Sequence, residues 1–277
     1  MKPSGANRAA AISPAARQVL CTAVLAAGAA IMRHRGHGFA VDRKADASPV
    51  TVADREAEAI LLEALAIAAP GVPVVAEEEF AAGRVPAIAG LFFLVDALDG
   101  TKEFVEGGDD FTVNVGLVRD GTPVFGIVFA PARALMFWGD VDAGAAWRMV
   151  ARDGASPEPI RCGPSHPCPR AVASKSHCTA QTEAYLAACR AGERLSIGSS
   201  LKFALVASAE ADLYPRAGPT MEWDTAAGDA VLRAAGGMSY GLDGCPLAYG
   251  KPGFFNPGFV AAGTWTPAPL GTFYPTH

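Results

Sequence analysis

Apolar residues recur along the first part of the chain at helical spacing. Between Asp54 and Ala69 they fall at positions 57, 61, 64, 65 and 68, which predicts an amphipathic helix. A mainly apolar stretch at residues 19–32 predicts an earlier helix. We expect that helix to end at His34-Arg35-Gly36, because cations and a glycine favour a helix C-terminus. Residues 1–13 are expected to form a disordered tail.

The middle of the chain changes to a pattern typical of strands. Apolar runs at residues 112–119, 123–129, 134–138 and 145–149 are separated by turn residues, which predicts an antiparallel meander. Shorter runs at 72–76 and 91–95 predict two earlier strands. Residues 153–170 are rich in Pro, Gly and Ser and form the best candidate boundary. Beyond it, strands predicted at 171–173, 194–197 and 211–215 alternate with helices at 181–191, at 199–209 and from Asp224 onward.

This alternation predicts a chain of two halves. Residues 1–160 would form an α+β half with the antiparallel sheet, and residues 161–277 a smaller α/β half. A length of 277 residues suits one large domain or two closely packed ones.

Two carboxylates stand at the end of the predicted strand 91–95, in Asp96-Ala-Leu-Asp-Gly-Thr101. Carboxylates this close repel each other unless a cation or a shared proton lies between them. Hard divalent metals such as Mg²⁺ prefer oxygen ligands and keep positions open for water and phosphate. The segment therefore predicts a metal-dependent chemistry on phosphate.

Further acids follow other predicted elements. Glu77 follows the strand 72–76, Asp224 opens a helix of small residues, and Asp54 stands three residues after Thr51. Each acid alone has a simpler explanation: Thr51 and Asp54 fit a capping box, and residues 77–79 fit a solvated loop. Their occurrence together favours a shared site.

Two motifs carry a family resemblance. Asp96-Ala-Leu-Asp-Gly-Thr101 resembles the D-P-[IL]-D-G-T signature, and Trp223-Asp-Thr-Ala-Ala-Gly228 the W-D-x-A-A-G signature, of the inositol monophosphatase superfamily of Mg²⁺-dependent, lithium-sensitive phosphatases. Segments 99–104, 196–203, 213–220 and 256–259 are similar to its CysQ branch, the 3'(2'),5'-bisphosphate nucleotidases of sulfur assimilation. The resemblance runs from about Ser48 to Val260 and implies a layered αβαβα sandwich of the α/β (α+β) class.

The chain departs from the signatures at two positions. Ala97 stands where the signature usually has Pro, and Glu79 where the branch often has Asp. Because Pro fixes φ, we expect Ala97 to loosen the loop between the two acids and to lower Mg²⁺ affinity. We expect Glu79 to lie outside the metal ligands.

The resemblance implies two or three Mg²⁺ ions. Glu77, Asp96 and the carbonyl of Leu98 would hold the first, and Asp96, Asp99 and Asp224 the second. Thr101 would orient the attacking water with help from Asp54, which acts either directly or within a third, weaker metal site. Asp54, Glu77 and Thr101 are thus the predicted catalytic residues.

The resemblance also implies a nucleotide substrate, 3'-phosphoadenosine 5'-phosphate, hydrolysed to AMP. Its sulfated analogue, 3'-phosphoadenosine 5'-phosphosulfate, is a further candidate. The implied contacts are the backbone N–H groups of Gly100 and Thr101, if a helix begins there, with His177, Ser199, Ser200, Lys202 and Arg216. Simple N-capping explains the two serines equally well. Two alternatives remain: a phosphatase of the same superfamily acting on inositol monophosphate or a sugar phosphate, and a non-catalytic phospholigand-binding protein.

Charge narrows the class of partner. The net charge of -5 excludes a generally basic nucleic-acid binder. A polyanionic substrate then needs local positive charge, which bound cations would supply together with Lys175, Lys202 and Arg216.

Cysteine usage and the N-terminal stretch bear on location. The six cysteines show no even, closely spaced pattern of the kind that forms a disulfide framework, which favours reduced thiols in a cytosol. Cys162, His166, Cys168, His177 and Cys178 fit no standard zinc spacing. Residues 19–32 resemble a signal peptide. A membrane span takes about 20 apolar residues, and this stretch is shorter, so we prefer a helix packed on the core. We expect a cytoplasmic protein without a transmembrane segment; attachment to the inner membrane and a homodimer stay open.

Overall fold

The computed structural model describes residues 12–37, 41–43, 49–152, 154–164, 166–173 and 179–274. The predicted tail at 1–13 lies almost wholly outside them.

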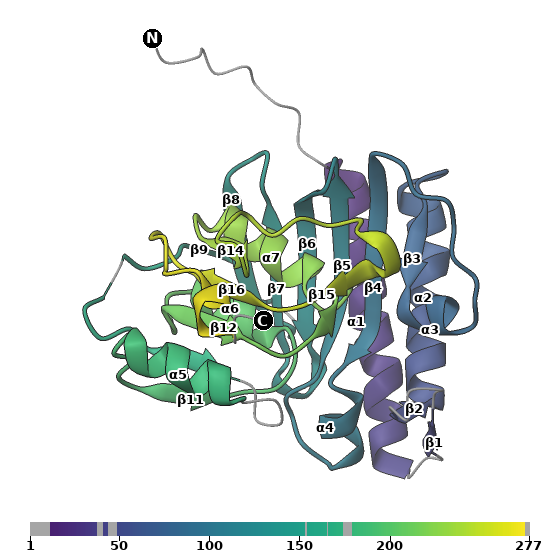
Figure 1. The fold of residues 1–277 in the computed structure, drawn as a ribbon. Coiled ribbons are helices and arrows are strands. Elements are labelled where there is room, and N and C mark those ends of the chain that lie inside the picture. The colour runs from purple at the N-terminus through teal and green to yellow at the C-terminus, as the bar shows by residue number, and fades with distance from the viewer. Residues whose placement is uncertain are drawn as a thin grey trace.

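A seven-stranded sheet forms the first half, with its strands in chain order (Figure 1). Only the first pair, β3 and β4, is parallel, and the remaining pairs are antiparallel. The predicted meander is therefore confirmed, and one further strand, β9, lies in the predicted boundary segment. The strands are β3 (Val74–Ala76), β4 (Leu91–Asp99), β5 (Thr112–Arg119), β6 (Thr122–Ala130), β7 (Leu135–Asp140), β8 (Ala145–Val150) and β9 (Glu158–Ile160).

Two long helices, α1 (Pro14–His37) and α2 (Val52–Ala68), cover one face of this sheet. Thr51 caps α2, and Thr51 and Asp54 form the predicted capping box. Ahead of α2, the short strands β1 (Val41–Arg43) and β2 (Pro49–Thr51) pair with each other. Both predicted helices are confirmed.

Helix α1 is longer than the apolar stretch that predicted it. Residues 14–35 are long and apolar enough to cross a membrane by length and composition, so the expectation that this segment is too short was wrong. The helix nevertheless buries a stripe within the protein: Leu20, Val24 and Ile31 are fully buried in the core shared with α2 and the sheet. The chain itself thus covers its apolar face.

The second half contains a five-stranded sheet in the order β11-β10-β12-β16-β14. Helices α6 and α7 lie between the two sheets, and α5 packs on the outer face of the smaller one (Figure 1). The layers are therefore helices, sheet, helices, sheet, helix, as the family resemblance implied. The elements are β10 (Ala171–Ala173), α5 (Ala180–Ala188), β11 (Arg194–Ser196), α6 (Leu201–Ala207), β12 (Leu213–Arg216), α7 (Ala226–Ala234), β14 (Met238–Gly241) and β16 (Phe259–Ala262).

Short elements complete the chain, and several of them carry site residues. They are the helices α3 (Glu77–Ala81) and α4 (Thr101–Val105), the 3-10 turns η1 (Pro131–Arg133), η2 (Pro252–Phe254) and η3 (Leu270–Phe273), and the strands β13 (Thr220–Met221) and β15 (Phe255–Asn256), which pair with each other. Strands β13 to β16 were not predicted. The two large sheets separate between residues 160 and 171, yet one core cluster draws residues from both, so the division into halves stays a prediction.

A row of glycines fixes the distance between α7 and the large sheet. Gly116, Gly126 and Gly139 are direct cross-strand neighbours on β5, β6 and β7. A methyl group at Gly116 would lie 2.8 Å from the backbone nitrogen of Ala227, and one at Gly126 would fall on the carbonyl oxygen of Ala227. Because glycine has no side chain, the row leaves a groove on the sheet in which α7 lies.

Candidate active site

The end of β4 carries two of the predicted metal ligands on an irregular stretch of strand. Asp96 pairs with Asn114 and Asp99 with Thr112, so three steps along β4 match two along β5. Residues three apart in a regular strand face opposite sides, and one extra residue removes this alternation. The bulge thus allows both carboxylates to serve one site.

The bulge corrects the expectation for Ala97. We expected a loop between the two acids, but this residue lies inside β4 and is 2% exposed. Its position is held by the surrounding sheet and core. The predicted fall in Mg²⁺ affinity stays a prediction.

Three carboxylates from distant segments meet beside this bulge. Oxygens of Glu77, Asp96 and Asp224 all lie within 4.8 Å of one another. Glu77 begins α3, and Asp224 lies two residues before α7. Among the described residues, no Cys or His joins such a group.

A neighbouring acid, Glu58, fixes the start of α3. The carboxylate of Glu58 accepts hydrogen bonds from the backbone N–H groups of Glu78 (2.9 Å) and Glu79 (3.0 Å). The side chain of Glu79 instead pairs with Arg84. This places Glu79 away from the three carboxylates, in line with the expectation that it is not a ligand.

Electrostatics show that the acid cluster fits a cation. Burial raises the pKa of Asp96 well above its ordinary value, and the carboxylates of Glu77, Asp99 and Asp224 raise it further. Burial and then Asp224 raise the pKa of Asp99 to about 7, although Lys202 opposes this. An all-oxygen set of crowded, buried charges is the donor set that a hard divalent cation satisfies.

Thr101 connects the predicted catalytic residues. Its hydroxyl lies 3.0 Å from Oδ1 of Asp54 and 3.0 Å from the carbonyl oxygen of Leu98, and it donates to either. The other oxygen of Asp54 accepts from the backbone N–H of Thr51 at 2.8 Å. Asp54 is thus both a capping residue and a partner of Thr101, so the two explanations for it hold together.

A cavity of about 300 Å³ opens over these residues. Its lining includes the acids Glu77, Asp99 and Asp224 and the cations Lys202 and Arg216. The cavity is also lined by Gly100, Thr101, Lys102, Glu103, Ser199, Ser200, Tyr214, Thr220 and Thr225.

The two cations of the cavity lining, Lys202 and Arg216, are held differently. The ammonium of Lys202 is 2.5 Å from the carbonyl oxygen of Ser199, and burial lowers its pKa to about 8 although Asp99 opposes the shift. Arg216 donates from Nη2 to the carbonyl of Pro219 at 2.9 Å. Its buried Nε has no hydrogen-bond partner among the described residues.

One of the predicted serine contacts, Ser200, is part of the scaffold. The backbone N–H of Ser200 donates to Oδ2 of Asp99 at 2.5 Å, and its hydroxyl donates to Oδ1 of Asn114 at 2.6 Å. Ser200 makes no side-chain cap on α6. It therefore ties the second half to Asp99, and direct contact of Ser199 or Ser200 with substrate stays a prediction. His177 and Lys175 lie outside the described residues.

The sequence did not single out two residues that shape the site. The hydroxyl of Thr220 donates to Asp224, and the ring of Tyr214 lines the cavity. Both lie in the segment 213–220 that carried the family resemblance. Only the folded chain shows what they contact.

The raised pKa values predict how pH acts on the metal-free protein. Folding raises the pKa of both Asp96 and Asp99, and that of Asp99 to about 7. The contribution of Asp99 to stability is therefore complete below about pH 4 and is lost as pH rises through 7. We expect the melting temperature in chelator to fall between pH 5 and 8 relative to that in Mg²⁺, so that the gain from Mg²⁺ grows with pH. Thermal melts in EDTA and in Mg²⁺ at each pH measure this gain. A gain that does not change with pH would contradict the prediction.

Comparison with known proteins shows the family of the chain. The model of the inositol monophosphatase family matches residues 15–268. The chain is 42% identical over 217 residues to the 3'(2'),5'-bisphosphate nucleotidase CysQ of Shigella flexneri, covering 78% of this chain and 86% of that protein. It is 40% identical over 243 residues to CysQ of Escherichia coli O157:H7, covering 87% and 96%.

A solved structure extends the likeness to three dimensions. The crystal structure of CysQ from Bacteroides thetaiotaomicron, a bacterial member of the same family, superimposes with a TM-score of 0.75 at 34% identity, covering 90% of this chain and 97% of the other. The sequence likeness and the shared fold thus point to one family. The chain belongs to the inositol monophosphatase family, a family of metal-dependent phosphatases.

Proposed function

We propose that the chain hydrolyses the 3'-phosphate of 3'-phosphoadenosine 5'-phosphate, giving AMP and phosphate, with the sulfated analogue as a second substrate. The observation that carries this is the cavity, whose lining combines the acids Glu77, Asp99 and Asp224 with the cations Lys202 and Arg216. One phosphate of a bisphosphate would lie at the acids and their metal ions, and the other would be bound by the cations. The CysQ relatives, named as 3'(2'),5'-bisphosphate nucleotidases, support the choice of substrate.

The acid cluster would hold Mg²⁺. Glu77, Asp96 and the Leu98 carbonyl would bind one ion, and Asp96, Asp99 and Asp224 a second, with a third, weaker site beside Asp54. Bound divalent ions lower the pKa of water and offset charge on phosphoryl oxygens.

Thr101 and Asp54 would orient the attacking water. The hydroxyl hydrogen of Thr101 points to Asp54 or to the Leu98 carbonyl, so the lone pairs of its oxygen remain free to accept. A water that donates one hydrogen to this oxygen turns a lone pair toward the phosphorus atom. Such positioning lowers the entropic cost of attack.

Arg216 and Lys202 would select the substrate. The guanidinium of Arg216 suits a phosphate because its planar donors match two oxygens. Lys202 adds a second charge nearby. An inositol monophosphate has no second phosphate for these two cations to bind.

Phosphate release from the two substrates tests the proposal. We expect Mg²⁺-dependent release from 3'-phosphoadenosine 5'-phosphate with a higher kcat/KM than from inositol 1-phosphate. Arg216→Ala should lower kcat/KM for the bisphosphate by roughly 10- to 100-fold, the effect of a lost charged hydrogen bond, and change that for the monophosphate much less. Equal or faster release from inositol 1-phosphate would favour the other phosphatase. Mg²⁺ binding without release from any phosphate ester would favour a binding protein.

For location, we propose a cytoplasmic enzyme. The five described cysteines, Cys21, Cys162, Cys168, Cys189 and Cys245, are free thiols, which supports a reducing compartment.

A further inference from the structure

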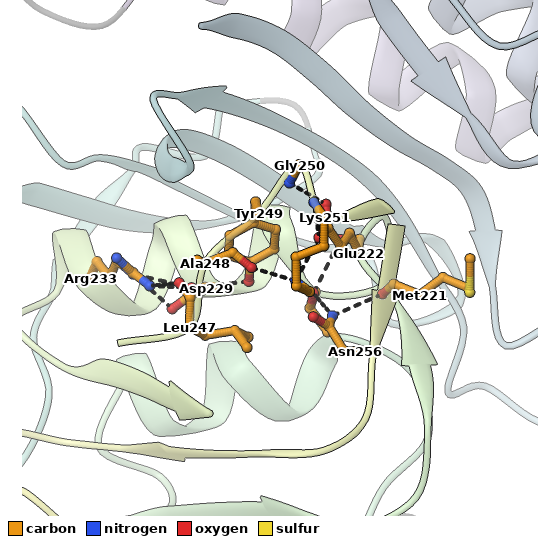
Figure 2. Close-up of polar contacts among 11 residues, drawn as sticks. Met221, Glu222, Asp229, Arg233, Leu247, Ala248, Tyr249, Gly250, Lys251 and Asn256 are labelled. Atoms are coloured by element: carbon orange, nitrogen blue, oxygen red, sulfur yellow. Dashed lines mark hydrogen bonds and ion pairs between the residues drawn. The ribbon is translucent and has the colours of Figure 1, made fainter. Parts of the chain in front are cut away.

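A buried ion pair lies just before Asp224 in the chain. Glu222 is fully buried, and its carboxylate accepts hydrogen bonds from the backbone N–H of Gly250 (2.6 Å) and of Lys251 (3.0 Å) (Figure 2). The ammonium of Lys251 lies 2.6 Å away, on a side chain that is 32% exposed. A buried carboxylate is tolerated only when its charge and hydrogen bonds are satisfied, and segment 250–251 satisfies both.

The same C-terminal segment holds the turn that contains Asp224. The backbone N–H of Glu222 donates to the carbonyl of Phe254 at 2.8 Å. The side-chain amide of Asn256 donates to the hydroxyl of Thr225 at 3.1 Å, on the other side of Asp224. Strands β13 and β15 add a ladder of only two residue pairs, which is weak by itself. The ion pair of Glu222 with Lys251 is a further link between these two segments.

The position of the Asp224 carboxylate depends on β13 directly. Its Oδ2 accepts from the backbone N–H of Met221 at 3.0 Å and from the hydroxyl of Thr220. A shift of β13 therefore moves the carboxylate relative to Glu77 and Asp96, which belong to other elements.

The segment that carries Lys251 has a firm anchor on α7. Asp229, also fully buried, accepts from Arg233 at 3.1 Å and from the hydroxyl of Tyr249 at 3.0 Å, and Arg233 donates to the carbonyl of Leu247 at 2.7 Å (Figure 2). The side chain of Lys251 therefore reaches Glu222 from a segment that contacts with α7 hold in place.

We propose that Lys251 is a positioning residue for the divalent metal site. Its ammonium neutralises Glu222 and so holds β13 and the carboxylate of Asp224 at the distance that the metal requires. This inference rests on the proposed role of Asp224 as a metal ligand. The lysine itself touches no predicted metal ligand and no predicted substrate contact among the described residues.

Binding of Mn²⁺ to metal-stripped protein, followed by electron paramagnetic resonance without substrate, tests the inference. We expect Lys251→Met to weaken Mn²⁺ binding by about 10-fold or more, the usual effect of residues that orient ligands. Lys251→Arg should restore most of the affinity because it keeps the charge and the donors. If Lys251→Met does not fold, Lys251→Gln, which keeps a donor without the charge, carries the same expectation.

Arg170→Met is the matched control. The side chain of Arg170 is 40% exposed and pairs at 2.8 Å with that of Asp212, which is 5% exposed. Asp212 lies just before β12, and Arg216 lies at the other end of that strand. Its loss should lower the melting temperature without weakening Mn²⁺ binding.

Two results would overturn the inference. In the first, the lysine variants bind Mn²⁺ as tightly as the wild type while losing as much melting temperature as the control. In the second, the wild type itself binds no Mn²⁺, which would remove the metal site. A wild type that binds Mn²⁺ but releases no phosphate from the bisphosphate would overturn the proposed substrate alone, and the weaker binding of Lys251→Met would still support the inference.

Discussion

Asp99→Asn is expected to reduce Mg²⁺-dependent turnover by about 10³-fold or more, which corresponds to about 4 kcal/mol of activation free energy. The substitution removes the charge that would bind the second metal. It keeps an oxygen that accepts from the N–H of Ser200, so the link between the two halves survives. Because Asp99 has its pKa raised to about 7, its ionised form is costly in the metal-free protein. We therefore expect the metal-free variant to melt at the wild-type temperature or higher. Phosphate release and melts in EDTA measure the two effects.

Asp212→Asn provides the opposite case. Burial raises the pKa of this carboxyl, but its hydrogen bonds with Arg170 outweigh burial and lower it below the ordinary value. Its charge therefore stabilises the fold, and its removal should lower the melting temperature while turnover at saturating Mg²⁺ persists. If Asp99→Asn retained turnover, or if it lost stability as Asp212→Asn does, the acid cluster would not be a metal site.

Local patterns explain why much of the fold was predictable. The capping box of Thr51 and Asp54 and the spacing of apolar residues in α2 are properties of a few neighbouring residues. The meander was likewise visible because its strands are six to nine residues long and two of its three turns contain glycine. Strands β13 to β16 are two to four residues long and owe their pairing to distant segments. No local period marks such strands, so they were missed.

The site divides in the same way. Asp96, Asp99 and Asp224 stand in motifs that can be recognised in the sequence, and the fold brings Asp96 and Asp224 together with Glu77. The bulge at Ala97 was taken for a loop because an extra residue in a strand leaves no mark on an apolar run. The pairing of Glu222 with Lys251 joins residues 29 positions apart and could not be read from spacing.

Gly126→Ala is expected to destabilise the protein by about 1–3 kcal/mol, the usual cost of overpacking, or by about 3–10 °C in melting temperature. The added methyl group would fall on the carbonyl oxygen of Ala227, and backbone of α7 cannot rotate away as a side chain would. Relief requires α7 to move off the large sheet. Since α7 begins two residues after Asp224, this movement should also weaken Mn²⁺ binding.

Gly192→Ala separates this effect from the general effect of adding a methyl group. The nearest atom to its Cβ would be the carbonyl oxygen of Cys168 at 3.5 Å, an ordinary contact, and its φ lies outside the left-handed region. Its free energy of unfolding should change by less than about 1 kcal/mol, so its melting temperature should change little. A Gly126→Ala variant as stable as Gly192→Ala would mean that α7 does not depend on the glycine row for its place on the sheet. A destabilised variant with unchanged Mn²⁺ binding would mean that the turn carrying Asp224 is held by β15 and Lys251 independently of α7.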